Sequence, residues 1–151
     1  IDKDGKKIGY ARSVWAMISL NTRKPADLLA LHGGSIVDYV CDEPCPIEKP
    51  SRIKVTSTEP ASSLNAKYSD IDINGHVNSI RYIEHILDLF PIEMNKVSRI
   101  RRFEMAYVAE SYYGDELTFY KDYVGNGTYD IEVRKNGGEA VCRSKVIFVE
   151  K

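Results

Sequence analysis

The sequence is poor in cysteine, and its few cysteines do not have the spacing of a disulfide framework or a zinc site. Cys41, Cys45 and Cys142 are odd in number, and the CDEPC stretch has no second pair of Cys or His near it. Small disulfide-dependent domains usually carry an even set of cysteines, and structural zinc sites need four ligands at short spacings. We therefore expect free thiols, no metal site and a reducing, cytoplasmic compartment.

The sequence also lacks an excess of charge of one sign and a long apolar run. Lys and Arg number 21 against 22 Asp and Glu, for a net charge of -1. Domains that bind nucleic acid usually show a clear basic excess. A membrane-spanning helix needs about 18 consecutive apolar residues, whereas residues 80–90 are interrupted by Glu84, His85 and Asp88. The composition, 43% hydrophobic over 151 residues, fits one globular domain or two small ones sharing a core. We expect neither nucleic acid nor a membrane as partner.

The start of the sequence lacks a methionine and the pattern of a secretory signal. Because the first residue is Ile1, we expect the natural N-terminus to lie upstream. Alternating apolar residues predict a strand over residues 7–20. Pro25, Asp27 and the pair Gly33 and Gly34 predict a short helix over residues 21–34. Four prolines follow between residues 41 and 60, a composition typical of a linker lying on a surface.

The second half of the sequence predicts a long helix followed by four strands. Apolar residues fill about half of a helical wheel that starts at Val77, and Pro91 marks the end of the helix. His85 shares the polar arc with Arg81 and Asp88, so we expect it at the surface. Residues 99–111, 116–124, 128–135 and 139–151 predict strands of an antiparallel meander, separated by YGD, VGNG and NGG turns. One preceding strand and a half-apolar helix lying across this sheet give an α+β hotdog fold, a long central helix wrapped by an antiparallel sheet.

Polar residues occupy every second position just before the predicted helix. They are Asp70, Asp72, Asn74 and His76. In an extended backbone these side chains would line one face of a strand end. Each also has an ordinary structural interpretation: an aspartate caps a turn or a helix, Asn followed by Gly is a common turn dipeptide, and a lone histidine is usually structural.

The segment SDIDINGHVNSIRYIEHILDLFP resembles the signature of the acyl-acyl-carrier-protein thioesterases of bacteria and plant plastids. In that family a D-x-N-x-H-V-N-N-x-x-Y-I segment leads into the central helix of the second of two tandem hotdog domains. The resemblance implies that residues 60–151 are this second domain. Residues 1–59 would be the C-terminal part of a first hotdog domain plus the interdomain linker, because KKIGYARSVWAMISLNTRKP is similar to its closing strand. The implied activity is hydrolysis of acyl-acyl-carrier protein to free fatty acid in fatty acid biosynthesis.

By this resemblance the catalytic residues fall on Asp72, Asn74, His76 and Glu110. The stretch YVAESYYGDEL around Glu110 is similar to the family's Y-x-x-E-[CA]-x-x-G-D. Thioester hydrolysis needs a positioned water, a base and donors for the developing oxyanion. His76 and Glu110 are candidate bases, Asn74 would orient the water or the carbonyl, and Asp72 would orient Asn74 or His76; which group takes the first proton stays open. Plant members often have Cys where this sequence has Ser111, so a papain-like cysteine mechanism is not expected there.

Two further residues belong to the predicted substrate-binding stretch. The first turn of a helix offers unpaired backbone N–H groups and the positive end of a dipole, which suit an oxyanion. Gly75 has no side chain and lets a substrate approach the backbone closely. Asn78 lies where it would cap or line the start of the helix.

The resemblance implies an acidic acyl carrier protein as partner, with the acyl chain on its phosphopantetheine arm, and no metal or organic cofactor. Lys96, Arg99, Arg101 and Arg102 form the densest basic cluster, which would either meet that acidic partner or be a solvated strand end. Hotdog domains generally pair sheet to sheet, so we expect pairing within the intact chain or as a homodimer. Two other functions stay open: an acyl-CoA thioesterase, and a non-catalytic module that binds acyl thioesters.

Overall fold

The computed structural model describes residues 1–22, 24–41 and 43–151, which divide into two compact units, Ile1–Pro50 and Ser51–Lys151. In these described residues, no helix is both long enough and apolar enough to cross a membrane.

The N-terminal unit contains the helix η1 (Leu28–Tyr39), which has 3-10 geometry. Asp27 caps it, because its carboxylate accepts a hydrogen bond from the N–H of Leu29 at 2.9 Å. The helix begins later than the predicted segment 21–34. It also continues through Gly33 and Gly34, so the glycine pair does not end it.

The prediction of a strand over residues 7–20 is wrong. Of the described residues in this segment, Ile18 forms an isolated bridge with Pro25, and the remainder is not in a strand. Val14 and Trp15 are 86% and 88% exposed. A strand is held by hydrogen bonds to a neighbouring strand, and in the described part of the N-terminal unit no strand lies beside this segment.

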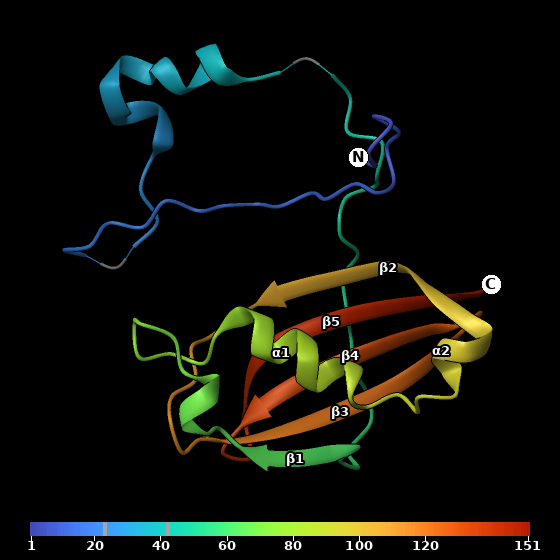
Figure 1. Ribbon diagram of the computed structural model, residues 1–151. Coiled ribbons are helices and arrows are strands. Elements are labelled where there is room, and N and C mark those ends of the chain that lie inside the picture. Colours follow the sequence, from blue (N-terminus) through green and yellow to red (C-terminus); the bar gives the residue numbers. More distant parts are fainter. Residues whose placement is uncertain (23, 42) are drawn as a thin grey trace. The chain divides into compact units, whose positions relative to one another are not determined.

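The C-terminal unit is built on a five-stranded antiparallel sheet with the order β1-β3-β4-β5-β2 (Figure 1). The strands are β1 (Ser62–Asn65), β2 (Ser98–Tyr107), β3 (Glu116–Gly125), β4 (Thr128–Lys135) and β5 (Glu139–Glu150). Strands β3, β4 and β5 form the predicted meander, but β2 pairs with β5 rather than with β3. The segment between β2 and β3 therefore crosses the end of the sheet.

The turn between β3 and β4 requires its glycine. Asn126 and Gly127 have φ values of 49° and 69°, which match the Asn-Gly pair of tight hairpin turns. A Cβ atom at position 127 would collide with the carbonyl oxygen of Phe148. Both the positive φ and the close approach of β5 exclude a larger residue there.

Helix α1 (Ser79–Leu87) lies across one face of this sheet, which gives a hotdog-like arrangement (Figure 1). Tyr82 and Ile86, four residues apart, are 3% and 0% exposed and face the core. Buried residues of the strands complete this core, among them Leu117, Phe119, Ile131, Val133, Val141 and Val146. Burial of a side chain such as Ile86 contributes about 1.5–3 kcal/mol.

The prediction of a long central helix is wrong, because α1 has nine residues and α2 (Met94–Val97) has four. Asn78 caps α1 and fixes its start. Just after the C-terminus of α1, the N–H of Leu89 donates at 3.2 Å to the carbonyl three residues back, which is the spacing of a turn. Pro91 has no N–H with which to continue the helix.

Residues 51–60 run across the face of the sheet opposite to α1 (Figure 1). The N–H and hydroxyl of Ser51 donate to the Glu104 carboxylate at 2.8 and 3.2 Å. The N–H and hydroxyl of Thr56 donate to the Asp122 carboxylate at 2.6 and 2.8 Å. The N–H of Ser57 donates to the same carboxylate at 3.0 Å. The N–H of Thr56 is the main cause that lowers the pKa of Asp122. These bonds explain why this part of the predicted linker belongs to the C-terminal unit.

Candidate functional site

The polar row before α1 forms a turn, so the prediction that it lines an extended strand is wrong. The helix η2 (Tyr68–Asp70) is a single 3-10 turn. The carboxylate of Asp72 then accepts the N–H groups of Asn74 and His76 at 2.8 and 3.3 Å. The N–H of Asp72 donates to the carbonyl of His76 at 2.8 Å. A short aspartate side chain commonly folds its own backbone in this way, and here it holds the turn that carries Asn74 and His76.

Gly75 supplies the backbone conformation that closes this turn. Its φ is +81°, and its N–H donates to the carbonyl of Asp72 at 3.0 Å. No heavy atom lies within 4 Å of the position that a Cβ would take. The glycine is therefore required by its dihedral angle, and the space beside it is open, as close approach of a substrate would need.

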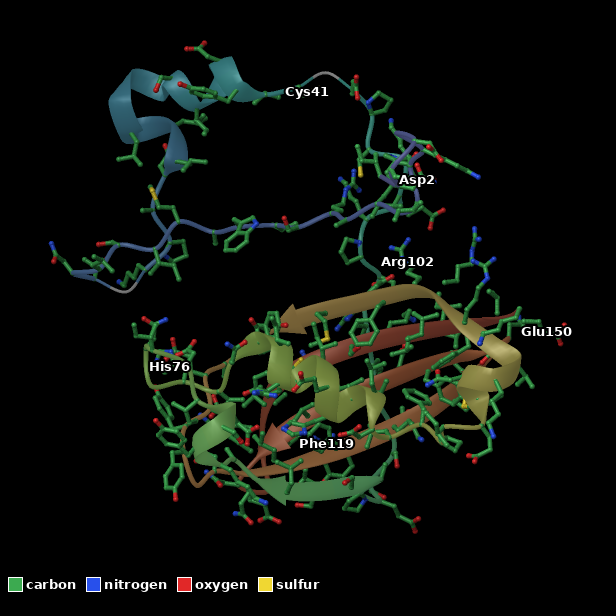
Figure 2. The ribbon with its side chains drawn as sticks, viewed as in Figure 1. Asp2, Cys41, His76, Arg102, Phe119 and Glu150 are labelled. Carbon is green, nitrogen blue, oxygen red and sulfur yellow. The ribbon has the colours of Figure 1, made fainter. Side chains whose placement is uncertain are left out.

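His76 and Glu110 come together from two separate segments. His76 lies in the turn before α1 (Figure 2). Glu110 lies between β2 and β3. Their Nε2 and Oε2 atoms are 3.5 Å apart, with the side chains 31% and 47% exposed. This distance is longer than the usual range of about 2.7–3.2 Å, but catalytic hydrogen bonds are often long before substrate binds.

A backbone hydrogen bond sets the spacing of the two segments. The N–H of Val77 donates to the carbonyl of Ser111 at 2.8 Å. These residues directly follow His76 and Glu110, so the bond ties the two chain segments together immediately beside the pair. The side chain of Ser111 is itself buried, with the residue 1% exposed.

Asn74 and Asn78 are placed differently from each other. Asn74 is exposed in the turn beside Gly75. The side-chain oxygen of Asn78 accepts the N–H of Ile80 at 2.9 Å, and its carbonyl accepts the N–H of Arg81 at 2.9 Å. Asn78 is thus the N-cap of α1, and these two donors of the first turn are bonded to it.

The expectation that His85 lies at the surface is wrong. Its side chain is 19% exposed, and its Nε2 lies 3.3 Å from Oδ1 of Asp70. The other oxygen of Asp70 accepts the N–H of Lys67 at 2.7 Å. The imidazole also meets the ring of Phe119, with centroids 6.2 Å apart. His85 is three residues after the buried Tyr82, and this spacing is the signal that would have placed it beside the core.

The basic cluster lies on α2 and on the edge strand β2. Lys96, Arg99 and Arg101 are exposed, and the register of β2 against β5 shifts between Ile100 and Arg102. Arg102 is bonded to the nearly buried Glu104 at 2.5 Å. Arg102 lies on a different part of the unit from the turn that carries His76 (Figure 2), so the structure does not bring the cluster to the pair.

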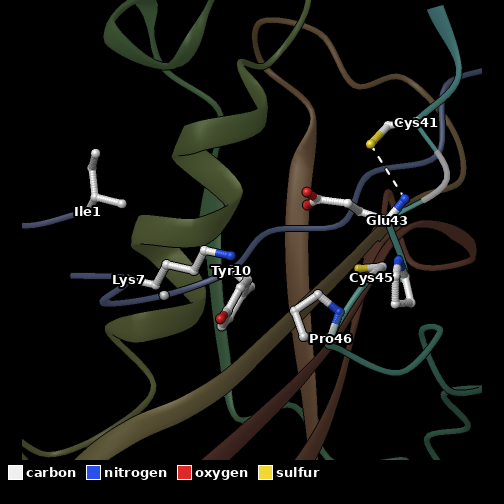
Figure 3. A pocket seen from close by; sticks show the side chains of 9 residues that line it. Ile1, Lys7, Tyr10, Cys41, Glu43, Cys45 and Pro46 are labelled. Carbon is white, nitrogen blue, oxygen red and sulfur yellow. Dashed lines mark hydrogen bonds between the residues drawn. The ribbon is translucent and has the colours of Figure 1, made fainter. Parts of the chain in front are cut away.

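A separate hollow lies within the N-terminal unit (Figure 3). Its described lining consists of Ile1, Lys7, Gly9, Tyr10, Cys41, Glu43, Pro44, Cys45 and Pro46. The N–H of Glu43 donates to Sγ of Cys41 at 3.4 Å. Cys41 and Cys45 are exposed free thiols. Over the described part of the chain, no group of three or more His, Cys, Asp or Glu side chains is placed to hold a metal ion.

Comparison with known protein families gives a match over the C-terminal unit. The family described as "Acyl-ACP thioesterase C-terminal domain" matches residues 53–150. The chloroplastic palmitoyl-acyl carrier protein thioesterase of Arabidopsis thaliana is 28% identical over 112 residues, which are 70% of this chain and 27% of that protein. The chloroplastic dodecanoyl-[acyl-carrier-protein] hydrolase of Cinnamomum camphora is 26% identical over 113 residues, 72% of this chain and 30% of that protein.

Solved structures show the same similarity. An acyl-ACP thioesterase from Bacteroides thetaiotaomicron is 78% identical with a TM-score of 0.92, covering 99% of this chain and 60% of that one. The 12:0-ACP thioesterase from Umbellularia californica shares the fold, with a TM-score of 0.70 at 18% identity, over 89% of this chain and 53% of that one. The chain thus spans between about a quarter and 60% of the length of these relatives.

Proposed function

Because the chain belongs to the acyl-ACP thioesterase family, we propose that the protein hydrolyses the thioester of acyl-acyl-carrier protein and releases free fatty acid in fatty acid biosynthesis. The observation that carries this proposal is the meeting of His76 and Glu110, with Nε2 and Oε2 3.5 Å apart. An imidazole and a carboxylate in reach of each other supply the proton transfer that activates a water molecule. Their partial exposure leaves room for that water and for a substrate.

The chemical step can be written with these residues. The His76–Glu110 pair takes a proton from water, and the water oxygen forms a bond to the thioester carbon. The carbonyl oxygen becomes negative, and the C–S bond then breaks. The sulfur leaves as the thiol of the phosphopantetheine arm, with the proton that the pair returns. The exposed amide of Asn74 orients the water or the carbonyl, and Asp72 holds the turn in which Asn74 and His76 stand.

The test is release of free thiol from palmitoyl-acyl-carrier protein by the intact protein. His76→Ala and Glu110→Ala should each lower kcat by about a hundredfold or more, the range for loss of an acid-base group. Glu93→Ala, at an exposed carboxylate of the same unit, is the matched control and should keep the activity. Faster hydrolysis of acyl-CoA than of acyl-acyl-carrier protein at equal concentration would show that acyl-CoA is the substrate instead. Acyl binding with no His76-dependent hydrolysis would indicate a binding module.

For the domain organisation, we propose that residues 60–151 are a second hotdog domain and residues 1–59 the end of a first one plus the linker. The match of residues 53–150 to the C-terminal domain of the family supports the second part of this division. The outer strands of the described sheet, β1 and β2, are where a paired hotdog domain would meet it, within the intact protein or in a homodimer. The exposed free thiols of Cys41 and Cys45 support a cytoplasmic, reducing location.

We also propose that the acidic carrier protein meets the basic cluster through Arg99 and Arg101. Arg102 contributes less, because its guanidinium is bonded to Glu104. The double substitution Arg99→Glu and Arg101→Glu should raise KM for the carrier-linked substrate about tenfold, and the increase should be larger at low salt. The KM for a small thioester should not change. Reversal of Arg102 would place two carboxylates together and is a poorer probe. Equal effects on both substrates would remove the docking proposal and leave the hydrolysis untouched.

A further inference from the structure

Tyr112 contacts both members of the His76–Glu110 pair. Its hydroxyl donates a hydrogen bond to Oε2 of Glu110 at 3.0 Å. This is the same oxygen that faces Nε2 of His76. The ring of Tyr112 meets the imidazole edge to face, with centroids 5.2 Å apart and planes at 78°. One side chain therefore touches the two groups on which the proposed hydrolysis depends.

Asp115 connects the backbone of Tyr112 to the turn between β4 and β5. Its N–H donates to one oxygen of Asp115 at 2.9 Å, and the other oxygen of Asp115 accepts the side-chain amide of Asn136 at 2.9 Å. The hydrogen bond from Asn136, followed by that from the N–H of Tyr112, lowers the pKa of Asp115. Asp115 is thus charged at neutral pH and links the main chain of Tyr112 to Asn136.

The main chain and the carboxylate of Glu110 are held by different residues. Lys135 of β4 donates from Nζ to the carbonyl of Glu110 at 2.8 Å, and its Nζ lies 5.9 Å from the ring centroid of Tyr112. Tyr112 bonds the carboxylate itself. A glutamate side chain has several rotamers of similar energy, and a hydrogen bond to its carboxylate favours the one that faces the donor.

We propose that Tyr112 is a positioning residue for the proposed reaction, whose hydroxyl turns the Glu110 carboxylate towards His76 while its ring supports the imidazole. This inference rests on the proposed function. Tyr112 does not need to touch the substrate for this role. It raises the fraction of molecules in which the two groups are within reach of each other, and such alignment is a large part of catalytic efficiency.

If Tyr112 only stabilised the fold, its substitution would lower the melting temperature; if it positions the pair, the melting temperature should not change. Tyr112 is 46% exposed, and hydrogen bonds between exposed groups contribute little to stability because water replaces them. Tyr112→Phe should therefore leave the melting temperature unchanged. The effect should be found in the chemical step alone.

The test compares Tyr112→Phe with Tyr113→Phe in the intact protein, with palmitoyl-acyl-carrier protein as substrate. Tyr113 is the adjacent tyrosine and is 72% exposed, so it controls for loss of a hydroxyl. Tyr112→Phe should lower kcat about three- to tenfold, the effect of one lost hydrogen bond between partly exposed groups, with KM within about twofold. An unchanged kcat, or a change confined to KM, would overturn the proposal.

A second readout does not depend on activity. The chain has three histidines, so the imidazole proton resonances of His76 can be assigned by substitution. Loss of the neighbouring ring in Tyr112→Leu should shift these resonances, and Tyr113→Leu should not. No shift would overturn the contact itself. Hydrolysis that needs His76 but is unaffected by Tyr112→Phe removes only the role of Tyr112, whereas absence of His76-dependent hydrolysis removes the proposed function as well.

Discussion

Replacing Asp70 with alanine should destabilise the C-terminal unit far more than replacing an exposed aspartate. The side chain of Asp70 is 9% exposed, and its two oxygens face Nε2 of His85 at 3.3 Å and the N–H of Lys67 at 2.7 Å. Its backbone carbonyl accepts the N–H of Asn78 at 2.7 Å. Asp70 therefore joins the turn that precedes His76 to the N-cap and to the last turn of α1.

The size of the effect follows from the donors that lose their acceptor. A buried donor left unsatisfied costs about 1–3 kcal/mol. Removal of the carboxylate leaves the imidazole N–H of His85, in a side chain that is 19% exposed, without this acceptor. The N–H of Lys67 lies in an exposed residue that water can reach. Asp70→Ala should therefore cost about 1–3 kcal/mol. Asp70→Asn keeps one acceptor oxygen and should cost about half as much, which provides a variant that stays folded.

The assay is urea unfolding of the intact protein followed by far-UV circular dichroism, with Asp70→Ala, His85→Ala and the double variant. A double-mutant cycle isolates the interaction of the pair, which should be about 1 kcal/mol or more. Asp88→Ala, at an exposed aspartate just after α1, should change stability by less than about 0.5 kcal/mol. Additive effects in the cycle, with no coupling, would refute the idea that Asp70 and His85 stabilise each other.

Three further predictions follow from the sheet. Gly127→Ala should destabilise the protein by about 1–3 kcal/mol through its positive φ and the collision with Phe148, which urea unfolding would detect. The folded-state pKa of Asp122 lies below its ordinary value of 3.8. The ionised carboxylate therefore stabilises the folded protein above pH 3.8, and this stabilisation is lost as the pH falls through the folded-state pKa. Asp122→Asn should make the free energy of unfolding less dependent on pH in the acid range. Burial raises the pKa of Cys142 to about 12, so a thiol reagent should modify Cys41 and Cys45 in the native protein and Cys142 only after unfolding.

The family and most strands were predictable because their signals are local. The segment before α1 indicated the family, which the match over residues 53–150 confirms. Strands β3, β4 and β5 were predicted because alternating residues and Asn-Gly turns specify a hairpin without reference to the rest of the chain. The pairing of β2 with β5 was missed, since the alternation within β2 fits either neighbour equally well and only the packing over α1 decides.

Several contacts around the predicted site residues could not be predicted from the sequence. Asp72 bonds to backbone N–H groups of its own turn, and an alternating pattern does not reveal that the backbone bends. His85 was assigned to the polar arc of a helix, but its buried partner Asp70 is 15 residues away in the chain. Tyr112 was not predicted to act, because its role depends on where the segment between β2 and β3 crosses the sheet.

The geometry of the pair can be divided between backbone and side chains. The bond from the N–H of Val77 to the carbonyl of Ser111, at 2.8 Å, fixes the distance between the two segments. It involves only the main chain of Ser111, so the bond itself does not depend on the identity of that buried side chain. The approach of the two side chains is then set by Tyr112, which bonds one and packs against the other. Substitutions at Ser111 should therefore act through packing of the core, and those at Tyr112 through alignment of the pair.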